Sequence, residues 1–288
     1  MKRFIIGLPL VLAFLFATGC GNSQKSTSVP EEDIDTVIVD SDQYVRFETT
    51  AGNFVIKLYR GTPLHRHNMV KQVKKGVYDG QLFFGIERGY KIQAGDPKSK
   101  GARPGVALGV EEENDTIQSE IDPFKYYHKK GAVGQASLRQ FDFSTSQQFY
   151  IITGIKSNDA TLDACEKKIN KRYFKAVKDS LTQPYAKDIL EYRDKGYKNK
   201  ISVLNDKLNK ETEAIMKTRP EFKYSKAQRK QYATEGGAAN LDGFYTVFGE
   251  VIEGIEVIEK ISMMHVDINS RPDPDVKIIK ATLIDCPE

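Results

Sequence analysis

Hydrophobic and polar side chains alternate along two neighbouring stretches of the chain, residues 44–49 and 54–59. Ala51, Gly52 and Asn53 lie between them and are residues typical of tight turns. Because side chains on a strand point alternately to opposite faces, the alternation predicts an antiparallel hairpin with one buried face. Residues 276–284 alternate in the same way and predict a last strand.

Two shorter apolar stretches, at residues 82–86 and 90–93, predict a second pair of strands. The turn dipeptide Asp79-Gly80 precedes the first stretch, and a Gly-Asp-Pro turn follows the second. The second stretch ends in Gln93, whose amide is set among apolar neighbours and needs a hydrogen-bond partner. This pattern favours a sheet face that binds a ligand through a few polar groups.

Helical spacing appears at two places, one at residues 62–76 and one at residues 253–261. Thr62 and Pro63 are typical of an N-cap and a first helical residue, and Gly76 is a typical stop. The helix between them places three apolar residues on its inner face: Met69, Val70 and Val73. Residues 253–261 predict a second amphipathic helix. Many short strands with two helices indicate a closed antiparallel barrel.

A long helical pattern interrupts the strands at residues 156–238. Apolar residues recur at helical spacing in two arms: Leu162, Cys165, Ile169, Tyr173, Val177 and Leu181, then Leu190, Tyr197, Ile201, Leu204, Leu208 and Ile215. Pro184 separates the arms, and Gly196 interrupts the second one. The pattern predicts an inserted antiparallel helical hairpin, followed by a short third helix over residues 225–234.

The N-terminus resembles a bacterial lipoprotein signal. Lys2 and Arg3 precede an apolar run over residues 4–16, and small residues lead into Cys20. The run is shorter than the roughly 20 residues of a membrane span. We therefore predict a signal peptide at residues 1–19, lipidation of Cys20, and a flexible tether over residues 20–43. The alternative is a plain secretory signal in which the cysteine is incidental.

The net charge of +4 is unevenly distributed. Residues 156–235 hold 20 Lys and Arg against 12 Asp and Glu, a net of +8, so the rest of the chain carries −4. A solvated helix surface explains these charges, and contact with anionic lipid or an acidic partner protein is the alternative. Nucleic acid is not expected as a partner, because the basic residues are interspersed with acidic ones.

Histidine and cysteine spacing does not match a metal site. His65 and His67 stand two apart, and His128 and His265 are isolated. Cys165 and Cys286 are far apart in the chain, and both are expected to be free, although an exported pair can form a disulfide. No metal and no cofactor are predicted.

Four motifs, in order along the chain, resemble those of the cyclophilins, the barrel-type peptidyl-prolyl isomerases. They are Tyr-Asp-Gly at 78–80 with Tyr-Lys-Ile-Gln-Ala-Gly-Asp-Pro at 90–97, Gly-Ala-Val-Gly-Gln-Ala at 131–136, Ser-Gln-Gln-Phe-Tyr-Ile at 146–151, and Leu-Asp-Gly-Phe-Tyr-Thr-Val-Phe-Gly-Glu-Val at 241–251. The resemblance implies a mainly β fold with α: a closed eight-stranded antiparallel barrel capped by two helices, with the helical hairpin inserted. The barrel would comprise residues 44–155 and 239–288, and the insertion residues 156–238.

The resemblance also implies a site for a proline residue. Its catalytic residues would be Gln93 and Gln148, and its substrate-binding residues would be Tyr90, Ala136, Tyr150, Leu241 and Tyr245. For the tyrosines and the leucine the alternative is a place in the barrel core, and for the two glutamines a mutual or backbone hydrogen bond.

The sequence departs from the family pattern at the residue that donates a hydrogen bond to stabilise the twisted amide. The spacing from residue 78 to Gln93 places Phe84 at the family's His position and Gly85 at its Arg position. Arg88, three residues further on, is the candidate to take over the role if a bulge turns its side chain toward the site. The loss of such a donor typically raises the barrier by about 3 kcal/mol, or 10²–10³ in rate.

The resemblance therefore implies a peptidyl-prolyl cis-trans isomerase of reduced activity, acting on proline-containing exported polypeptides. The lipid anchor would place it in the bacterial cell envelope, facing the periplasm or the cell surface. The alternative is a proline-peptide-binding or chaperone-like lipoprotein without turnover, with a protein partner at the helical insertion. In a third hypothesis the insertion is the functional part and the barrel only its scaffold.

Overall fold

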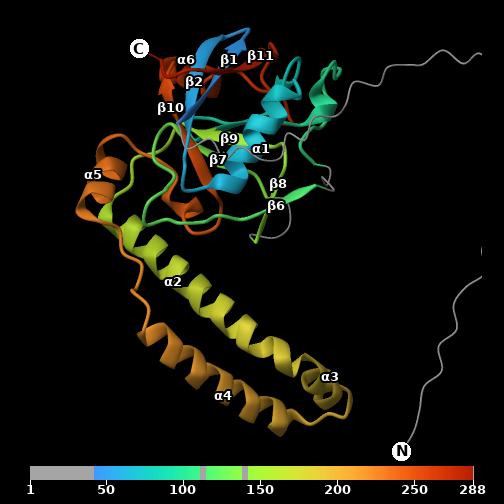
Figure 1. Cartoon of the computed structure of the whole chain (residues 1–288), viewed down its shortest axis with the longest axis vertical. Helices are drawn as coiled ribbons and strands as arrows, with labels where there is room; N and C mark the ends of the chain where they lie inside the picture. Colours follow the sequence, from blue (N-terminus) through green and yellow to red (C-terminus); the bar gives the residue numbers. More distant parts are fainter. Residues whose placement is uncertain (1–41, 111–114, 138–141, 288) are drawn as a thin grey trace, which may run out of the picture. The chain divides into compact units, whose positions relative to one another are not determined.

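The computed structural model describes residues 42–110, 115–137 and 142–287 (Figure 1). Nine strands form one sheet in the order β3-β11-β1-β2-β10-β7-β9-β5-β4, in which every paired strand is antiparallel. They are β1 (Gln43–Thr49), β2 (Gly52–Leu58), β3 (Leu82–Phe83), β4 (Gly85–Glu87), β5 (Lys91–Ala94), β7 (Ala132–Gln135), β9 (Phe149–Ile152), β10 (Val247–Glu253) and β11 (Val276–Ile284). The end strands β3 and β4 are separated by Phe84 alone, so the sheet forms a nearly closed barrel. A separate two-stranded sheet pairs β6 (Thr116–Gln118) with β8 (Phe143–Thr145).

The predicted count of eight strands was wrong, because the apolar run at residues 82–86 is two strands rather than one. β3 pairs with β11, whereas β4 pairs with β5. The chain changes strand partners at Phe84, so one continuous apolar segment serves both ends of the sheet. The hydrophobic pattern alone does not reveal this change of partner, because apolar residues lie on both sides of it.

The barrel interior is filled by aromatic and branched side chains from the alternating strands. Phe47 of β1 stacks on Phe54 of β2 with ring centroids 4.9 Å apart. The turn between these strands contains Gly52, whose φ of 134° is strained for any other residue. The predicted hairpin, with its buried inner face, is confirmed.

Two helices lie against the barrel, as predicted: α1 (Pro63–Lys74) and α6 (Ile255–Ser262). The expected inner face of α1 is buried, but the predicted side-chain cap by Thr62 is absent. Glu120 takes its place, since its carboxylate accepts the backbone N–H groups of Leu64 and His65, each at 3.0 Å. A carboxylate at this end also interacts favourably with the positive pole of the helix dipole.

The insertion consists of α2 (Asp159–Thr182), α3 (Ala186–Asp194), α4 (Lys198–Lys217) and α5 (Lys226–Thr234). Short 3₁₀ turns complete the fold: η1 (Pro97–Ser99), η2 (Gln183–Tyr185) and η3 (Ala239–Leu241). α2 and α4 form the antiparallel pair (Figure 1), but the predicted second arm is two helices. Gly196, with a φ of 70°, separates α3 from α4. The predicted third helix is confirmed as α5, and Ser225 caps it through a capping box.

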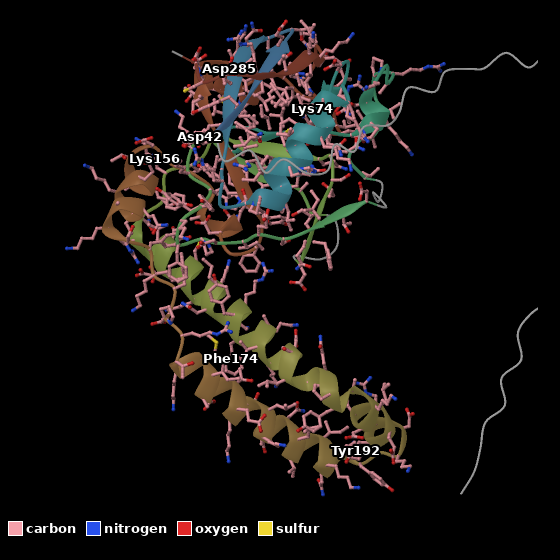
Figure 2. All side chains as sticks on the ribbon, viewed as in Figure 1. Asp42, Lys74, Lys156, Phe174, Tyr192 and Asp285 are labelled. Atoms are coloured by element: carbon pink, nitrogen blue, oxygen red, sulfur yellow. The ribbon has the colours of Figure 1, made fainter. Side chains whose placement is uncertain are left out.

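Burial differs sharply between the two ends of the insertion. Near the barrel, Leu162, Ile169 and Phe222 are each no more than 1% exposed and share one apolar cluster with residues of α5. In α3 no residue is buried, and in α4 only Leu208 and Thr212 are. Figure 2 labels Phe174 partway along α2 and Tyr192 at the far end. The near end therefore has an apolar cluster of its own, which also includes Ala239 of η3.

Candidate functional site

The two predicted amides lie together, and they form the mutual hydrogen bond that was the alternative to a catalytic role. Gln93 on β5 donates from Nε2 to Oε1 of Gln148 at 3.1 Å. The register of β5 and β9, in which Ala94 faces Phe149, brings them to adjacent positions. The Gln148 side chain lies on a residue that is 2% exposed, and the backbone carbonyl of Gln148 accepts the backbone N–H of Ala136 at 2.9 Å. The amide pair thus has a fixed geometry, with the partly exposed Gln93 facing outward.

The predicted substrate-binding residues gather in one apolar cluster beside this amide pair. Ala136 and Tyr150 are buried at its base, at 6% and 3% exposure. Three partly exposed residues lie against them: Tyr90, Leu241 and Tyr245. The rings of Tyr150 and Tyr245 meet edge to face, with centroids 6.2 Å apart. The arrangement offers an apolar surface next to two polar amides.

The strand β4 offers no cation at this site. Gly85 is paired directly with Gln93, and a Cβ atom at Gly85 would meet the Gln93 Cβ at 3.4 Å, an ordinary contact. The register of β4 and β5 has no bulge. Arg88 lies exposed in the turn that follows and makes no hydrogen bond or ion pair with the described residues. The bulge expected to turn its side chain toward the amides is absent.

Lys91 brings a cation to the edge of the site. Its Nζ atom lies 3.5 Å from Oε1 of Gln93 and 5.7 Å from the centre of the Tyr150 ring. It also pairs with Glu87 at 2.8 Å. The side chain is 21% exposed, so the aromatic ring and the two strands limit its freedom. Because side chains alternate along β5, Lys91 and Gln93, two residues apart, lie on the same face of the strand.

Beneath the cluster, a buried polar network holds Tyr150. Its hydroxyl lies 2.8 Å from Nε2 of His128, and Nδ1 of His128 lies 2.8 Å from Oδ1 of Asp242. A carboxylate only accepts, so Nδ1–H of His128 donates to Asp242, and in a neutral imidazole Nε2 then accepts from the Tyr150 hydroxyl. The ring needs Gly134 beneath it, because a Cβ there would lie 2.3 Å from the ring. Tyr150 is therefore fixed by its hydroxyl as well as by its ring.

The insertion completes this network. The hydroxyls of Tyr224 and Tyr232 both donate to Oδ2 of Asp242, at 2.7 and 2.6 Å. The backbone N–H of His128 adds a further donor, at 2.8 Å from Oδ1. Asp242 is 1% exposed, so these donors replace the water that a buried carboxylate requires. The polar support of the candidate site thus begins in the insertion.

Burial keeps the tyrosine hydroxyls of the site protonated. It raises the pKa of Tyr150 well above its ordinary value. Burial also raises the pKa of Tyr90, whose hydroxyl donates to Oδ1 of Asn240 at 2.8 Å. Burial raises the pKa of Tyr245, and the charge of Arg172 acts in the opposite direction. The site can therefore orient a polar backbone and hold an apolar ring, and it has no activated nucleophile.

The remaining sequence predictions concern cysteines, metals and the membrane. Cys165 is buried and Cys286 exposed, and both are free, whereas Cys20 lies outside the described residues. Within residues 42–110, 115–137 and 142–287, no three His, Cys, Asp or Glu side chains form a group able to hold a metal ion. None of the described helices has the length and apolar character needed to cross a membrane.

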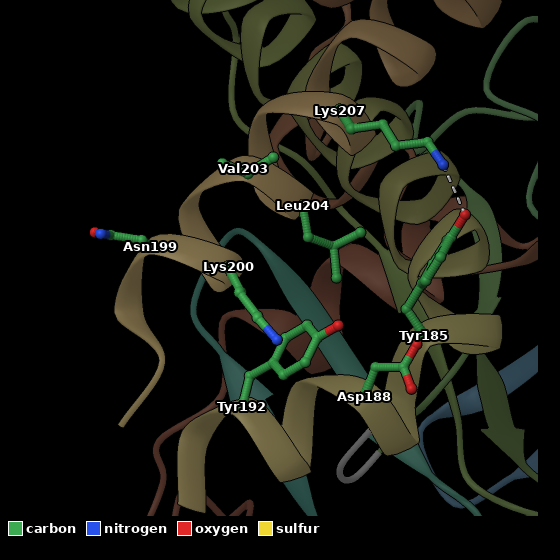
Figure 3. A pocket seen from close by; sticks show the side chains of 8 residues that line it. All are labelled: Tyr185, Asp188, Tyr192, Asn199, Lys200, Val203, Leu204 and Lys207. Atoms are coloured by element: carbon green, nitrogen blue, oxygen red, sulfur yellow. Dashed lines mark hydrogen bonds between the residues drawn. The ribbon is translucent and has the colours of Figure 1, made fainter. Parts of the chain in front are cut away.

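A separate hollow lies at the far end of the insertion, between α3 and α4 (Figure 3). Lys207 donates to the hydroxyl of Tyr185 at 2.9 Å, and Lys200 lies 5.0 Å from the centre of the Tyr192 ring. The aromatic groups of this hollow are thus already in contact with lysines of the same chain. It shares no residue with the amide pair or the apolar cluster.

Comparisons with known proteins identify the family of the chain. The family model described as "Cyclophilin type peptidyl-prolyl cis-trans isomerase/CLD" matches residues 44–177 and 205–283, more than half of the chain. A Staphylococcus haemolyticus protein named "Putative peptidyl-prolyl cis-trans isomerase" is 24% identical over 242 residues, which cover 84% of this chain and 91% of that protein. The Cryptococcus neoformans "Peptidyl-prolyl isomerase CWC27" is 30% identical over 128 residues, 44% of this chain and 23% of that protein. The crystal structure of a Cryptosporidium parvum cyclophilin type isomerase aligns with 86% of this chain and 100% of its own, at 16% identity and a TM-score of 0.48.

Proposed function

The chain belongs to the family of cyclophilin-type peptidyl-prolyl cis-trans isomerases, and we propose that it is an isomerase of low activity that acts on exported proline-containing polypeptides. The observation that carries the proposal is the hydrogen-bonded pair of Gln93 and Gln148 beside a cluster of apolar side chains. Rotation about an X-Pro bond needs no nucleophile, metal or cofactor, because the barrier arises from amide resonance.

The proposed mechanism is one of holding and orienting. The proline ring lies against Tyr150, Leu241 and Tyr245, which keep water away from the twisting amide. Gln93 and Gln148 bind the neighbouring backbone, so that the rotation is confined to one bond. The Tyr150 hydroxyl is bound to His128 and does not compete for the substrate.

Lys91 supplies positive charge in this proposal. A donor near the proline nitrogen stabilises the twisted amide, whose nitrogen is pyramidal and has lost its resonance. The Lys91 ammonium lies beside Gln93, and Glu87 shares its charge. An ammonium on a flexible stem is a weaker substitute for a planar guanidinium, which presents several donors in a fixed geometry. This fits an enzyme slower than relatives that have an arginine at position 85.

The second candidate function is proline-peptide binding without turnover. It is favoured by Gly85, which faces Gln93 and leaves the family's donor position without a side chain. A chaperone-like protein would use the same apolar cluster together with the helical insertion. Turnover separates the two candidates, since both require binding.

A proline-peptide exchange assay on the full chain tests the proposal. We expect wild-type protein to raise the cis–trans rate above background, and Gln148→Ala and Lys91→Met each to lower kcat/KM about ten-fold, the effect of losing roughly 1.4 kcal/mol. Lys74→Met, on the exposed side of α1, is the matched control and should leave the rate unchanged. Peptide binding with no acceleration by wild-type protein would favour the second candidate.

The location is part of the proposal. Residues 1–19 would direct export, and an acyl chain on Cys20 would hold the protein in the cell envelope. Metabolic labelling with a fatty acid in a bacterial host that acylates lipoproteins tests this directly. Wild-type protein should incorporate the label and Cys20→Ala should not, whereas equal labelling of both would refute a lipid anchor at this residue.

A further inference from the structure

A groove of about 950 Å³ follows α2 on the side that faces the barrel segment around Phe244. Most of its lining belongs to α2: Lys168, Lys171, Arg172, Phe174, Lys175, Ala176, Lys178, Asp179, Ser180 and Gln183. Asp142 and Phe244 line the barrel side. The groove shares no residue with the hollow of Figure 3.

The groove is predominantly cationic. Lys168, Lys171, Arg172, Lys175 and Lys178 recur at helical spacing, against two acidic residues. Asp179 pairs with Lys175, and Asp142 lies 3.6 Å from Arg172. Lys168, Lys171 and Lys178 form no ion pair with the described residues. Three positive charges along one face are thus available to an anionic ligand.

Apolar side chains give the groove a second character. Phe174 comes from α2 and Phe244 from the barrel. The Arg172 guanidinium lies 5.2 Å from the centre of the Phe244 ring, within the range of a cation–π contact. A ligand with both acidic and apolar groups fits such a lining better than a free anion does.

The groove adjoins the candidate proline site. Arg172 donates to the carbonyl of Gly243, and Gly243 leaves no room for a Cβ atom beside Ile169 of α2. The next residues are Phe244, which lines the groove, and Tyr245, which belongs to the apolar cluster of the proline site. A chain leaving that site past Tyr245 therefore meets the groove directly.

We propose that the groove binds an acidic, extended segment of the same polypeptide whose proline occupies the candidate site. This inference rests on the proposed function and adds client selection to it. The lining from residue 168 to residue 183 spans roughly 22 Å, the length of about seven extended residues. Continuity with a proline site favours a polypeptide over a lipid surface, and the unpaired lysines select aspartate and glutamate in its sequence.

Fluorescence anisotropy with labelled peptides and the full chain tests the inference. Each peptide carries one Ala-Pro unit and five glutamates, placed either after or before the proline, and matched peptides carry five serines. We expect one glutamate placement to bind about ten-fold more tightly than its serine partner, because several weak exposed charge pairs act together. The preference should weaken as salt rises.

A matched pair of variants locates the effect. Lys168→Gln, Lys171→Gln and Lys178→Gln together should abolish the preference for glutamate. Lys198→Gln, Lys210→Gln and Lys217→Gln change the same charge on α4 and should keep it. Equal loss in both triple variants, or no preference in wild-type protein, would overturn the inference.

Two further outcomes separate this inference from the proposed function. If the serine peptide is isomerised but glutamate gives no advantage, the groove proposal fails and the isomerase proposal stands. If replacing the proline by alanine leaves glutamate binding unchanged, the groove acts independently of the proline site and the proposed linkage is wrong. Binding to anionic vesicles through Lys168, Lys171 and Lys178, without glutamate preference, would instead identify a membrane contact and overturn the proposal.

Discussion

The two sides of the candidate site differ in how completely they are built. On the β4 side, Gly85 faces Gln93 with no side chain, and Arg88 lies exposed in the turn. On the opposite side, the Tyr150 hydroxyl is held by His128, and the network continues through Asp242 to the insertion. The first side is where a donor would speed rotation, and the second is where the proline ring would lie.

In the proposed function, this difference favours holding a proline over rotating it. A buried charged network stabilises a fold only when every polar group in it has a hydrogen-bond partner. The Asp242 carboxylate accepts from four donors. The insertion supplies two of those donors, so it is part of the site's support. The third hypothesis, in which the barrel is only a scaffold for the insertion, stays a prediction, because the same network would also anchor the insertion to such a scaffold.

Removing the carboxylate at the centre of the network should have the largest effect. Asp242→Ala leaves His128 and Tyr232 without their acceptor inside the protein. The Tyr224 hydroxyl keeps only its longer contact with the carbonyl of Ala239, at 3.2 Å. We expect the free energy of unfolding to fall by about 3–5 kcal/mol, the scale of a broken buried charged network. Urea denaturation of the full chain measures it.

Asp188→Ala, an exposed position on α3, is the matched control and should change the free energy of unfolding by less than about 0.5 kcal/mol. A similar small change for Asp242→Ala would show that the network contributes little, and the contrast between the two sides of the site would disappear.

Removing one donor from the insertion should have a smaller effect. Tyr232→Phe keeps the ring in its cluster and deletes one hydrogen bond to a carboxylate, so we expect a loss of about 1.5–3 kcal/mol. Tyr224→Phe should behave alike, and the double variant should be non-additive, since both hydroxyls share Oδ2. Strict additivity in urea denaturation would contradict a shared network.

Arg88→Ala should have the smallest effect, with kcat/KM and the free energy of unfolding both close to the wild-type values. The side chain is exposed and has no described hydrogen-bond partner. The peptide exchange assay measures the rate. A large loss of activity would show that Arg88 reaches the substrate when one is bound, and the β4 side would then not lack a cation.

Much of the fold could be predicted because its signals are local. The alternation of β1 and β2, the turn at Gly52 and the inner face of α1 depend on neighbouring residues alone. The change of strand partner at Phe84 was missed because it occurs inside one apolar run. The cap of α1 was assigned to Thr62, whereas Glu120 supplies it from 55 residues beyond His65.

The candidate site divides in the same way. Gln93 and Gln148 were predicted as a pair from their place in ordered motifs, and they do lie together. His128 looked isolated in the sequence because Asp242, its partner, stands 114 residues away. The tyrosines of the insertion could not be linked to Asp242 at all, since only the packing of α5 against the barrel brings them together.

The most direct test of the account compares wild-type protein with Gly85→Arg in the peptide exchange assay. Residue 85 is paired with Gln93 and has room for a Cβ atom, so an arginine there would restore the donor that the family pattern expects. We predict that Gly85→Arg raises kcat/KM about 10²–10³-fold. A wild-type rate that already equals that of the correctly folded Gly85→Arg variant would contradict the claim that this site holds proline well and rotates it slowly.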